Sequence, residues 1–104
     1  MSYQSSNFRS KKLLEYFKFA PMCFCCGNAN DGTVVAAHAN WHEFGKSGGM
    51  KAQDWAVAGL CHQCHSEIDQ GSKLSYDERK EKWVSAWIKT TDWLWRCGII
   101  KVGK

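Results

Sequence analysis

The residues most able to do chemistry in this sequence are thiols, imidazoles and carboxylates between positions 23 and 69. Four of the thiols form two pairs, and two residues separate the partners of each pair. Thiolates with C-x-x-C spacing are typical ligands of structural zinc, which prefers four soft donors in a tetrahedron. The sequence therefore predicts one zinc site made of Cys23, Cys26, Cys61 and Cys64.

The two remaining cysteines are assigned other places. Cys25 lies inside the first pair and could replace Cys23 or Cys26, although C-x-x-C spacing favours the outer two. Cys97 stands near the end of a predicted long helix, where we expect a small, buried apolar side chain.

The segment Cys61-His62-Gln63-Cys64-His65 also fits C-x-x-C-H, the attachment pattern of c-type haem. The first residues of the chain lack the apolar run of a secretory signal, and no segment approaches the ~18 apolar residues of a membrane span. We therefore expect a cytoplasmic protein with no membrane partner. Thiols stay reduced there, and covalent haem attachment has no obvious route, so zinc is favoured over haem.

A second set of ligands follows the second cysteine pair. On a helix that contains Cys64, His65 lies about 100° further around the axis, away from the zinc. Asp69 is four residues after His65, so the two side chains share one helix face and could hold one divalent cation. The same spacing also occurs in solvated surface pairs. His38 strengthens the functional interpretation, because an imidazole is unusual in the apolar segment where it lies.

Short elements must position these residues. Residues 33–41 (TVVAAHANW) are β-branched and apolar, as in a strand, and residues 54–60 could form the return strand. Residues 65–71 open a short helix. Residues 42–53 between the strands form a glycine-rich loop, in which Lys46 and Lys51 offer charges to phosphates.

Two helices are predicted to flank this core. A short amphipathic helix covers residues 10–19, and residues 1–9 before it are expected to be flexible. Ser75 and Glu78 form a capping box that starts a long helix from about 76 to 97. Its predicted apolar face consists of Trp83, Val84, Trp87, Ile88, Thr91, Leu94 and Trp95. We expect these tryptophans to pack in the core, and a platform for stacking bases is the alternative.

The composition is that of a small folded protein. At 104 residues, with 23% charged residues and one proline, the chain predicts a single domain over 1–104 with a modest core that a structural metal would stabilise. We predict an α+β fold: a zinc-stabilised core at about residues 20–72 between the N-terminal helix and the long C-terminal helix. A net charge of +4 suits a polyanionic partner without requiring one.

The cysteines, histidines and acids between residues 23 and 71 resemble those of the HNH nucleases, also called His-Me finger or ββα-metal nucleases. In that family a hairpin and a helix hold one catalytic metal, and zinc knuckles often clamp the base. The strings AAHANW, GKSGGMKAQD and LCHQCHSEID look more narrowly like the small phage and prophage nucleases of the YbcO type. The resemblance covers residues 23–71, and the closing KTTDWLWRCGIIK more loosely.

The resemblance implies a metal-dependent DNA endonuclease, encoded by a phage or prophage and acting in the cytoplasm of a bacterial host. It implies that His38 is the general base and that His65 and Asp69 hold the catalytic metal. Asp54 stands near the asparagine that gives the family its middle letter, where the side chain braces the loop through backbone hydrogen bonds. Lys46 and Lys51, with Arg9 and Lys12, would hold the DNA backbone.

Three residues depart from the family pattern. Ala37 stands where many members have an Asp or His that completes the metal site, and Asp replaces both the middle Asn and a final His. Only two protein ligands are then evident, so His38, His42, Asp54 or oxygens of water and substrate complete the shell. Such an oxygen-rich shell suits Mg²⁺ or Mn²⁺ better than a second zinc.

Two alternatives from other functional classes stay open. A non-catalytic zinc module that binds nucleic acid would need the cysteines and lysines but not His38. A protein-interaction adaptor would use the tryptophan-rich helix as a partner groove and would have no affinity for DNA. Neither needs the set of His38, His65 and Asp69, which is therefore the discriminating feature. The sequence leaves the preferred DNA structure and the oligomeric state open.

Overall fold

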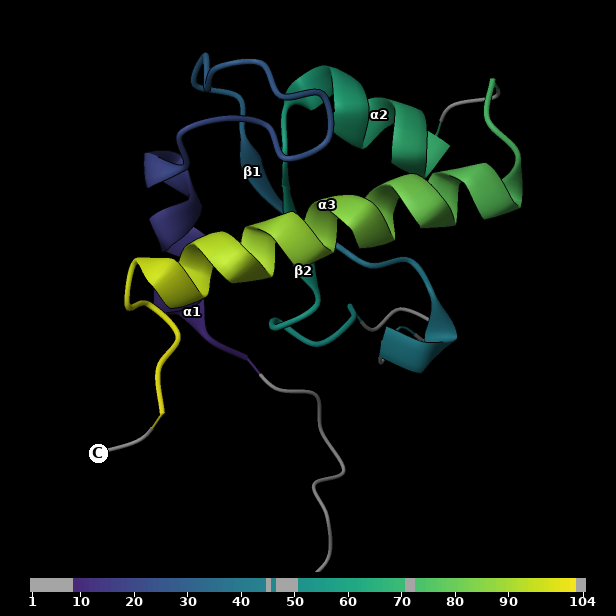
Figure 1. Ribbon diagram of the computed structural model, residues 1–104. Helices are drawn as coiled ribbons and strands as arrows, with labels where there is room; N and C mark the ends of the chain where they lie inside the picture. Colours follow the sequence, from purple (N-terminus) through teal and green to yellow (C-terminus); the bar gives the residue numbers. More distant parts are fainter. Residues whose placement is uncertain (1–8, 45, 47–50, 71–72, 103–104) are drawn as a thin grey trace, which may run out of the picture.

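The fold is built from short strands and helices around one long helix. The computed structural model describes residues 9–44, 46, 51–70 and 73–102. The elements within them are α1 (Lys11–Glu15), the 3₁₀ helix η1 (Tyr16–Phe19), β1 (Val35–His38), the 3₁₀ helix η2 (His42–Phe44), β2 (Val57–Leu60), α2 (His62–Gln70) and α3 (Tyr76–Arg96). The predicted α+β class, with a hairpin, a short helix and two flanking helical segments, is confirmed (Figure 1).

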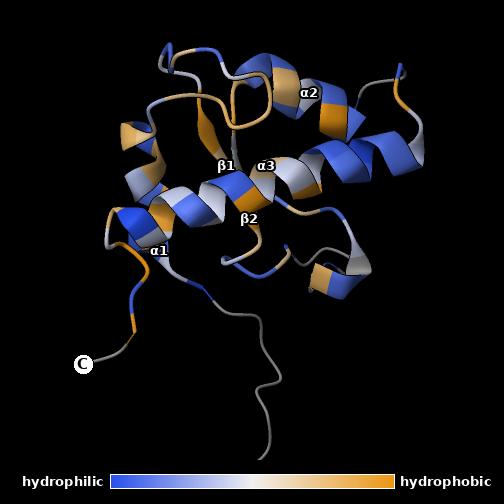
Figure 2. Cartoon of the chain, in the orientation of Figure 1, coloured by the Kyte–Doolittle hydropathy of each residue, from blue (hydrophilic) through white to orange (hydrophobic). Residues whose placement is uncertain are grey.

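The hairpin is the centre of the molecule. β1 and β2 are antiparallel, with Val35 opposite Leu60 and His38 opposite Val57. All four residues of β2 are buried, since α3 lies across this strand (Figure 1). Figure 2 shows the contrast between the mainly hydrophobic hairpin and the hydrophilic N-terminal half of α3. Among the described residues, no helix is long and apolar enough to cross a membrane.

The long helix begins as predicted and buries a narrower face than predicted. The Ser75 hydroxyl accepts a hydrogen bond from the Glu78 backbone N–H. The Glu78 carboxylate accepts one from the Ser75 backbone N–H, which completes the capping box. Its buried residues are Trp83, Ala86, Thr90 and Leu94. The prediction that Ile88 and Trp95 belong to the packed face is wrong, because they are 61% and 49% exposed. A two-stranded hairpin is too narrow to cover so broad a stripe.

The N-terminal segment forms a helix over the predicted range. Ser10 caps α1, and η1 continues it to Phe19. Leu13 and Phe17 pack with Val57 and Leu94 in a second cluster beside the main core. Residues 1–8 lie outside the described part of the chain, whereas Arg9, predicted to be flexible, is held by hydrogen bonds to residues 51–54.

The remaining short elements differ from the prediction mainly in their bounds. α2 starts three residues earlier than predicted, so that Cys64 lies in its first turn. The predicted loop 42–53 contains η2, and its residues 45 and 47–50 lie outside the described residues.

Gly59 allows the first cysteine turn to approach the hairpin. A Cβ at this position would lie 2.9 Å from Cδ2 of Phe24, a side chain that is itself buried. The Phe24 backbone N–H donates to the Gly59 carbonyl at 2.9 Å, so neither backbone can move away without losing that bond. Gly59 thus fixes the distance between the cysteine turn and β2.

We expect Gly59→Ala to lower the free energy of unfolding by about 1–3 kcal/mol, because it overfills a packed contact. Urea denaturation monitored by tryptophan fluorescence measures this. The penalty should be smaller in a Phe24→Leu background, where the clashing ring is absent. An equal penalty in both backgrounds would show that the Phe24 contact is not its cause.

Candidate metal centre and active site

The first cysteine pair lies on a tight turn. The Cys23 N–H donates to the Asn28 carbonyl, and the Gly27 N–H donates to the Cys23 carbonyl, both at 2.9 Å. Gly27 has φ of 81°, a left-handed conformation that glycine adopts without steric cost. The turn therefore brings the thiols of Cys23 and Cys26 to the same side of the chain.

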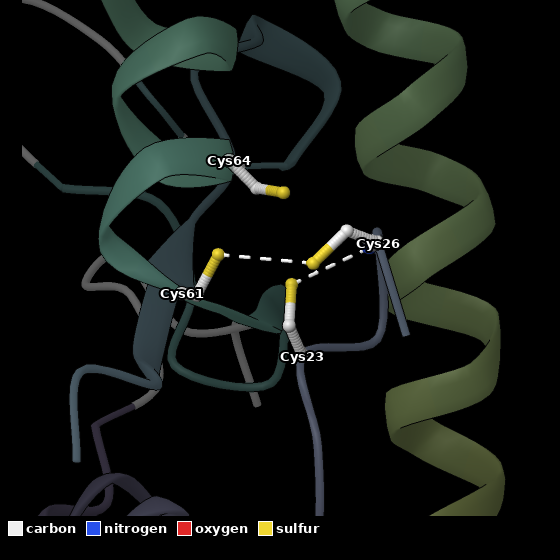
Figure 3. Close-up of side chains that lie close together, drawn as sticks. All are labelled: Cys23, Cys26, Cys61 and Cys64. Atoms are coloured by element: carbon white, nitrogen blue, oxygen red, sulfur yellow. Dashed lines mark hydrogen bonds between the residues drawn. The ribbon is translucent and has the colours of Figure 1, made fainter. Parts of the chain in front are cut away.

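The second pair comes from the junction between β2 and α2. Cys61 lies between the two elements and Cys64 lies in the first turn of α2. Figure 3 shows the side chains of Cys23, Cys26, Cys61 and Cys64 pointing toward one another. Their four sulfur atoms lie within 4.8 Å of one another. Cys26 Sγ and Cys61 Sγ are 3.9 Å apart.

This sulfur geometry fits a zinc ion. Four thiolates at ~2.3 Å from a tetrahedral zinc lie about 3.8 Å apart, close to the separation of Cys26 and Cys61. Among the described residues, these four are the one group of three or more Cys, His, Asp or Glu that could hold a metal. Cys25 is half-buried and outside the group. The cluster could therefore bind zinc through the four predicted cysteines.

The prediction that Cys97 is a buried apolar side chain is wrong, because Cys97 is exposed. It caps α3, and the chain turns back immediately after it through Gly98, whose φ is 76°. The Ile99 and Ile100 N–H groups then donate to the Leu94 carbonyl. The reversal lets Ile100, and not Cys97, pack against the cluster that contains Leu94.

The surroundings shift the pKa values of Cys23 and Cys64 in opposite directions. Burial raises the pKa of Cys64, and the hydrogen bonds that its thiol donates to neighbouring sulfurs raise it further. Burial also raises the pKa of Cys23, but the surrounding N–H donors outweigh burial and lower it to about 7. These donors include the Cys25 and Cys26 N–H groups, 3.4 and 3.5 Å from Cys23 Sγ. Four adjacent thiolates need a divalent cation, so metal binding must weaken at low pH.

We expect purified protein to contain one zinc ion per chain and Cys61→Ser to lose most of it and to melt at a lower temperature. Elemental analysis and thermal unfolding measure the two effects. Cys25→Ser is the matched control and should keep both zinc and stability, since its thiol lies outside the cluster. Zinc loss in Cys25→Ser with retention in Cys61→Ser would contradict this ligand assignment.

His38 is paired with a buried carboxylate. Its Nε2 lies 2.8 Å from Oδ1 of Asp54, a residue only 3% exposed. The Ser10 backbone N–H donates to Oδ2 of Asp54 at 2.6 Å, and Arg9 Nη1 lies 3.2 Å from Oδ1. Asp54 was expected to brace its loop through backbone hydrogen bonds. It accepts one backbone hydrogen bond, from the distant segment at Ser10, and it also holds the imidazole.

The surroundings of Asp54 keep it ionised. Burial raises its pKa, but the hydrogen bonds from His38 and Ser10 and the charge of Arg9 outweigh burial, so that the pKa is lowered. An ionised carboxylate at Nε2 selects the tautomer in which Nε2 carries the proton. Nδ1 of His38 is then the nitrogen that can accept a proton.

His65 and Asp69 meet as their spacing predicts. His65 Nε2 lies 2.8 Å from Asp69 Oδ2, and both side chains are about one-third exposed. The hydrogen bond to Asp69 raises the pKa of His65 more than burial lowers it. Asn40 Nδ2 donates to the other oxygen, Oδ1 of Asp69, at 2.8 Å. Sequence reasoning missed Asn40, although it stands only two residues after His38.

Asn40 links the two histidine regions. Ala37 and Ala39 are buried, and the Ala39 N–H donates to the Ala56 carbonyl, so the chain stays extended past β1. Side chains alternate along an extended chain, which puts His38 and Asn40 on the same face. Since Asn40 contacts Asp69, that face of the hairpin is turned toward α2.

The other predicted site residues have different outcomes. Asp54 is already engaged by His38, Ser10 and Arg9, which argues against its completing a metal shell with His65 and Asp69. The side chain of His42 lies outside the described part of the structure. Lys46 is half-buried and Lys51 is exposed, and residues 47–50 between them are among those not described.

The chain resembles a known structure in its fold. No protein-family model matches it, and no curated protein matches it. A similar solved structure is that of a protein from Escherichia coli strain K-12, substrain MG1655, provisionally described as a bacteriophage protein. The two chains are 22% identical with a TM-score of 0.56, and the match covers 80% of this chain and 95% of the other. At this identity the likeness concerns the fold alone.

We expect Asp54→Asn to lower the free energy of unfolding at pH 7 by about 1–3 kcal/mol, because it weakens charge-assisted hydrogen bonds. The lowered pKa of Asp54 means that its contribution is present above the ordinary carboxyl pKa and is lost as pH falls through the folded-state pKa. The gap between wild type and Asp54→Asn should therefore close below about pH 4. Denaturation of both proteins across pH measures the gap. A gap that is constant with pH would contradict an ionised Asp54.

Proposed function

We propose that this protein is a metal-dependent endonuclease that hydrolyses phosphodiester bonds in DNA. The observation that carries the proposal is the pairing of His38 with the buried, ionised Asp54 on a hairpin face that Asn40 connects to a second His–Asp pair. Hydrolysis of a phosphodiester needs a base for the attacking water and positive charge where negative charge develops. The His38–Asp54 pair can supply the base, and a cation held by His65 and Asp69 can supply the positive charge.

His38 acts as the general base. Its Nδ1 accepts the proton of the attacking water, while Nε2 donates to Asp54. The Asp54 carboxylate fixes the ring orientation and stabilises the imidazolium that forms.

His65 and Asp69 would hold the catalytic Mg²⁺ or Mn²⁺ ion. Their ligand atoms already lie 2.8 Å apart on a partly exposed helix face, which suits a site that must admit substrate. When bound, the ion supplies Lewis-acid stabilisation of the phosphoryl group and of the leaving oxygen. Asn40 orients the Asp69 carboxylate through Oδ1 and leaves Oδ2 directed at His65.

The zinc cluster positions this second pair. Cys64 is a proposed zinc ligand in the first turn of α2, and His65 is the next residue. A zinc ion bound to Cys61 and Cys64 would fix the start of the helix and therefore the direction in which His65 and Asp69 project. The cluster thus supports the chemistry without taking part in it.

Charged side chains take two roles in this proposal. Lys46 and Lys51 contact the DNA backbone. Arg9, expected to do the same, instead directs its guanidinium at Asp54 and at the carbonyls of Ala52 and Lys51. Arg9 therefore acts on the general base through Asp54. A phage or prophage origin and action in a bacterial cytoplasm are part of the proposal, and the solved structure that shares this fold is provisionally described as that of a bacteriophage protein.

Plasmid DNA incubated with purified protein and Mg²⁺ or Mn²⁺ should be nicked, and EDTA should stop the reaction. His38→Ala should lower the rate by about 10²-fold to 10⁴-fold, because the base is lost. The matched control is His62→Ala, an exposed histidine on α2 outside both pairs, which should keep activity. Gel electrophoresis of relaxed and supercoiled plasmid gives the rates.

Two outcomes would count against the proposal. Nicking that is unaffected by both His38→Ala and EDTA would point to a contaminating nuclease. DNA binding with no nicking in either metal would favour a non-catalytic zinc module that binds nucleic acid.

A further inference from the structure

A groove of about 850 Å³ lies between the N-terminal helical segment and the turn that follows α3. Figure 1 shows α1 beside the C-terminal end of α3, and Tyr16 stacks on Trp93 of α3 with ring centroids 5.3 Å apart. Apolar side chains supply most of the groove surface. The proposed catalytic mechanism uses none of these side chains.

The walls carry aromatic rings that the core does not bury. Phe19 is 63% exposed on one side of the groove and Trp55 is 44% exposed. Tyr16 lies between Phe19 and the core, 5.4 Å from the Phe19 ring centroid. Exposed aromatic faces of this kind are suited to stacking on flat ligands.

The rim of the groove is basic. Lys12, Lys18 and Lys101 are exposed there and face one exposed acid, Glu15. Lys18 Nζ lies 5.2 Å from the centre of the Phe19 ring, so a positive charge stands directly beside an aromatic surface. A ligand with flat apolar groups joined by negative charges is complementary to this arrangement.

The groove borders residues that neighbour Asp54. Ser10 and Trp55 both line it. The Ser10 N–H donates to Asp54, and Trp55 follows Asp54 in the chain. A strand lying in the groove would therefore pass beside the Ser10 backbone that holds Asp54.

We propose that this groove binds single-stranded DNA next to the cleaved phosphate, with bases stacked on Phe19 and Trp55 and phosphates paired with Lys12, Lys18 and Lys101. The proposal rests on the proposed function and specifies its substrate as DNA with an unpaired strand beside the cut. A duplex keeps its base faces stacked inside the helix and cannot use the aromatic walls. An acidic peptide would pair with the lysines but would offer no flat bases to stack on Phe19 and Trp55.

Binding is measured separately from cleavage, on the His38→Ala protein without added Mg²⁺ or Mn²⁺. The probes are a short fluorescein-labelled oligothymidylate, its abasic counterpart and a duplex of equal length, and the readout is fluorescence anisotropy. We expect the oligothymidylate to bind most tightly and Phe19→Ala to weaken its binding about tenfold, the loss typical of one stacked base. Lys18→Gln should reduce the salt dependence of log Kd by about 0.7, as for one phosphate contact on a single strand.

Matched controls separate the groove from the general surface. Tyr76→Ala removes an aromatic that is 59% exposed, and Lys89→Gln removes an exposed lysine; neither residue lines the groove. Both variants should bind the oligothymidylate like the parent protein. Circular dichroism confirms that each variant is folded.

Three results would overturn the groove assignment. The protein could bind oligothymidylate and its abasic counterpart equally well, or bind the duplex more tightly than either. Phe19→Ala and Tyr76→Ala could also weaken oligothymidylate binding equally. Displacement of the oligonucleotide by a glutamate- and leucine-rich peptide that binds more tightly would identify an acidic protein partner. Self-association that Phe19→Ala abolishes would identify a second copy of the chain. Failure of the wild-type protein to cleave DNA, with groove-dependent binding intact, would overturn the proposed function alone.

Discussion

The convergence of four sulfur atoms within 4.8 Å is the constraint on which the rest of this structure depends. It joins a turn at residues 23–26 to the junction between β2 and α2, two segments that also meet through Phe24 and Gly59. The first helical turn of α2 is fixed at that junction. The direction of His65 and Asp69 follows from it, and so does the distance from α2 to the hairpin.

Buried charge organises the other half of the site. Asp54 is nearly inaccessible and yet ionised, because His38, the Ser10 N–H and Arg9 surround its two oxygens. Burying a carboxylate without such partners is costly, so the four groups must be in place together. This requirement ties the N-terminal helical segment to the hairpin, and it also places Ser10, which lines the groove, against Asp54.

The site and the groove divide two tasks between different parts of the fold. The hairpin, the residue Asp54 before β2, and α2 carry the His–Asp pairs, whose hydrogen bonds are between 2.6 and 3.2 Å long. The groove carries exposed rings and lysines, which tolerate variable contacts.

The sequence by itself determined the features that depend on local spacing. The C-x-x-C pairs, the capping box at Ser75 and the contact between His65 and Asp69 all join residues within one turn of chain, where spacing fixes geometry. Tertiary structure decided the rest. It brought Arg9 and Ser10 to Asp54 across 45 and 44 residues and Asn40 to Asp69 across 29, and it left Ile88 and Trp95 exposed because the hairpin is narrow. No periodicity encodes such pairs, since they meet only when separate elements pack against one another.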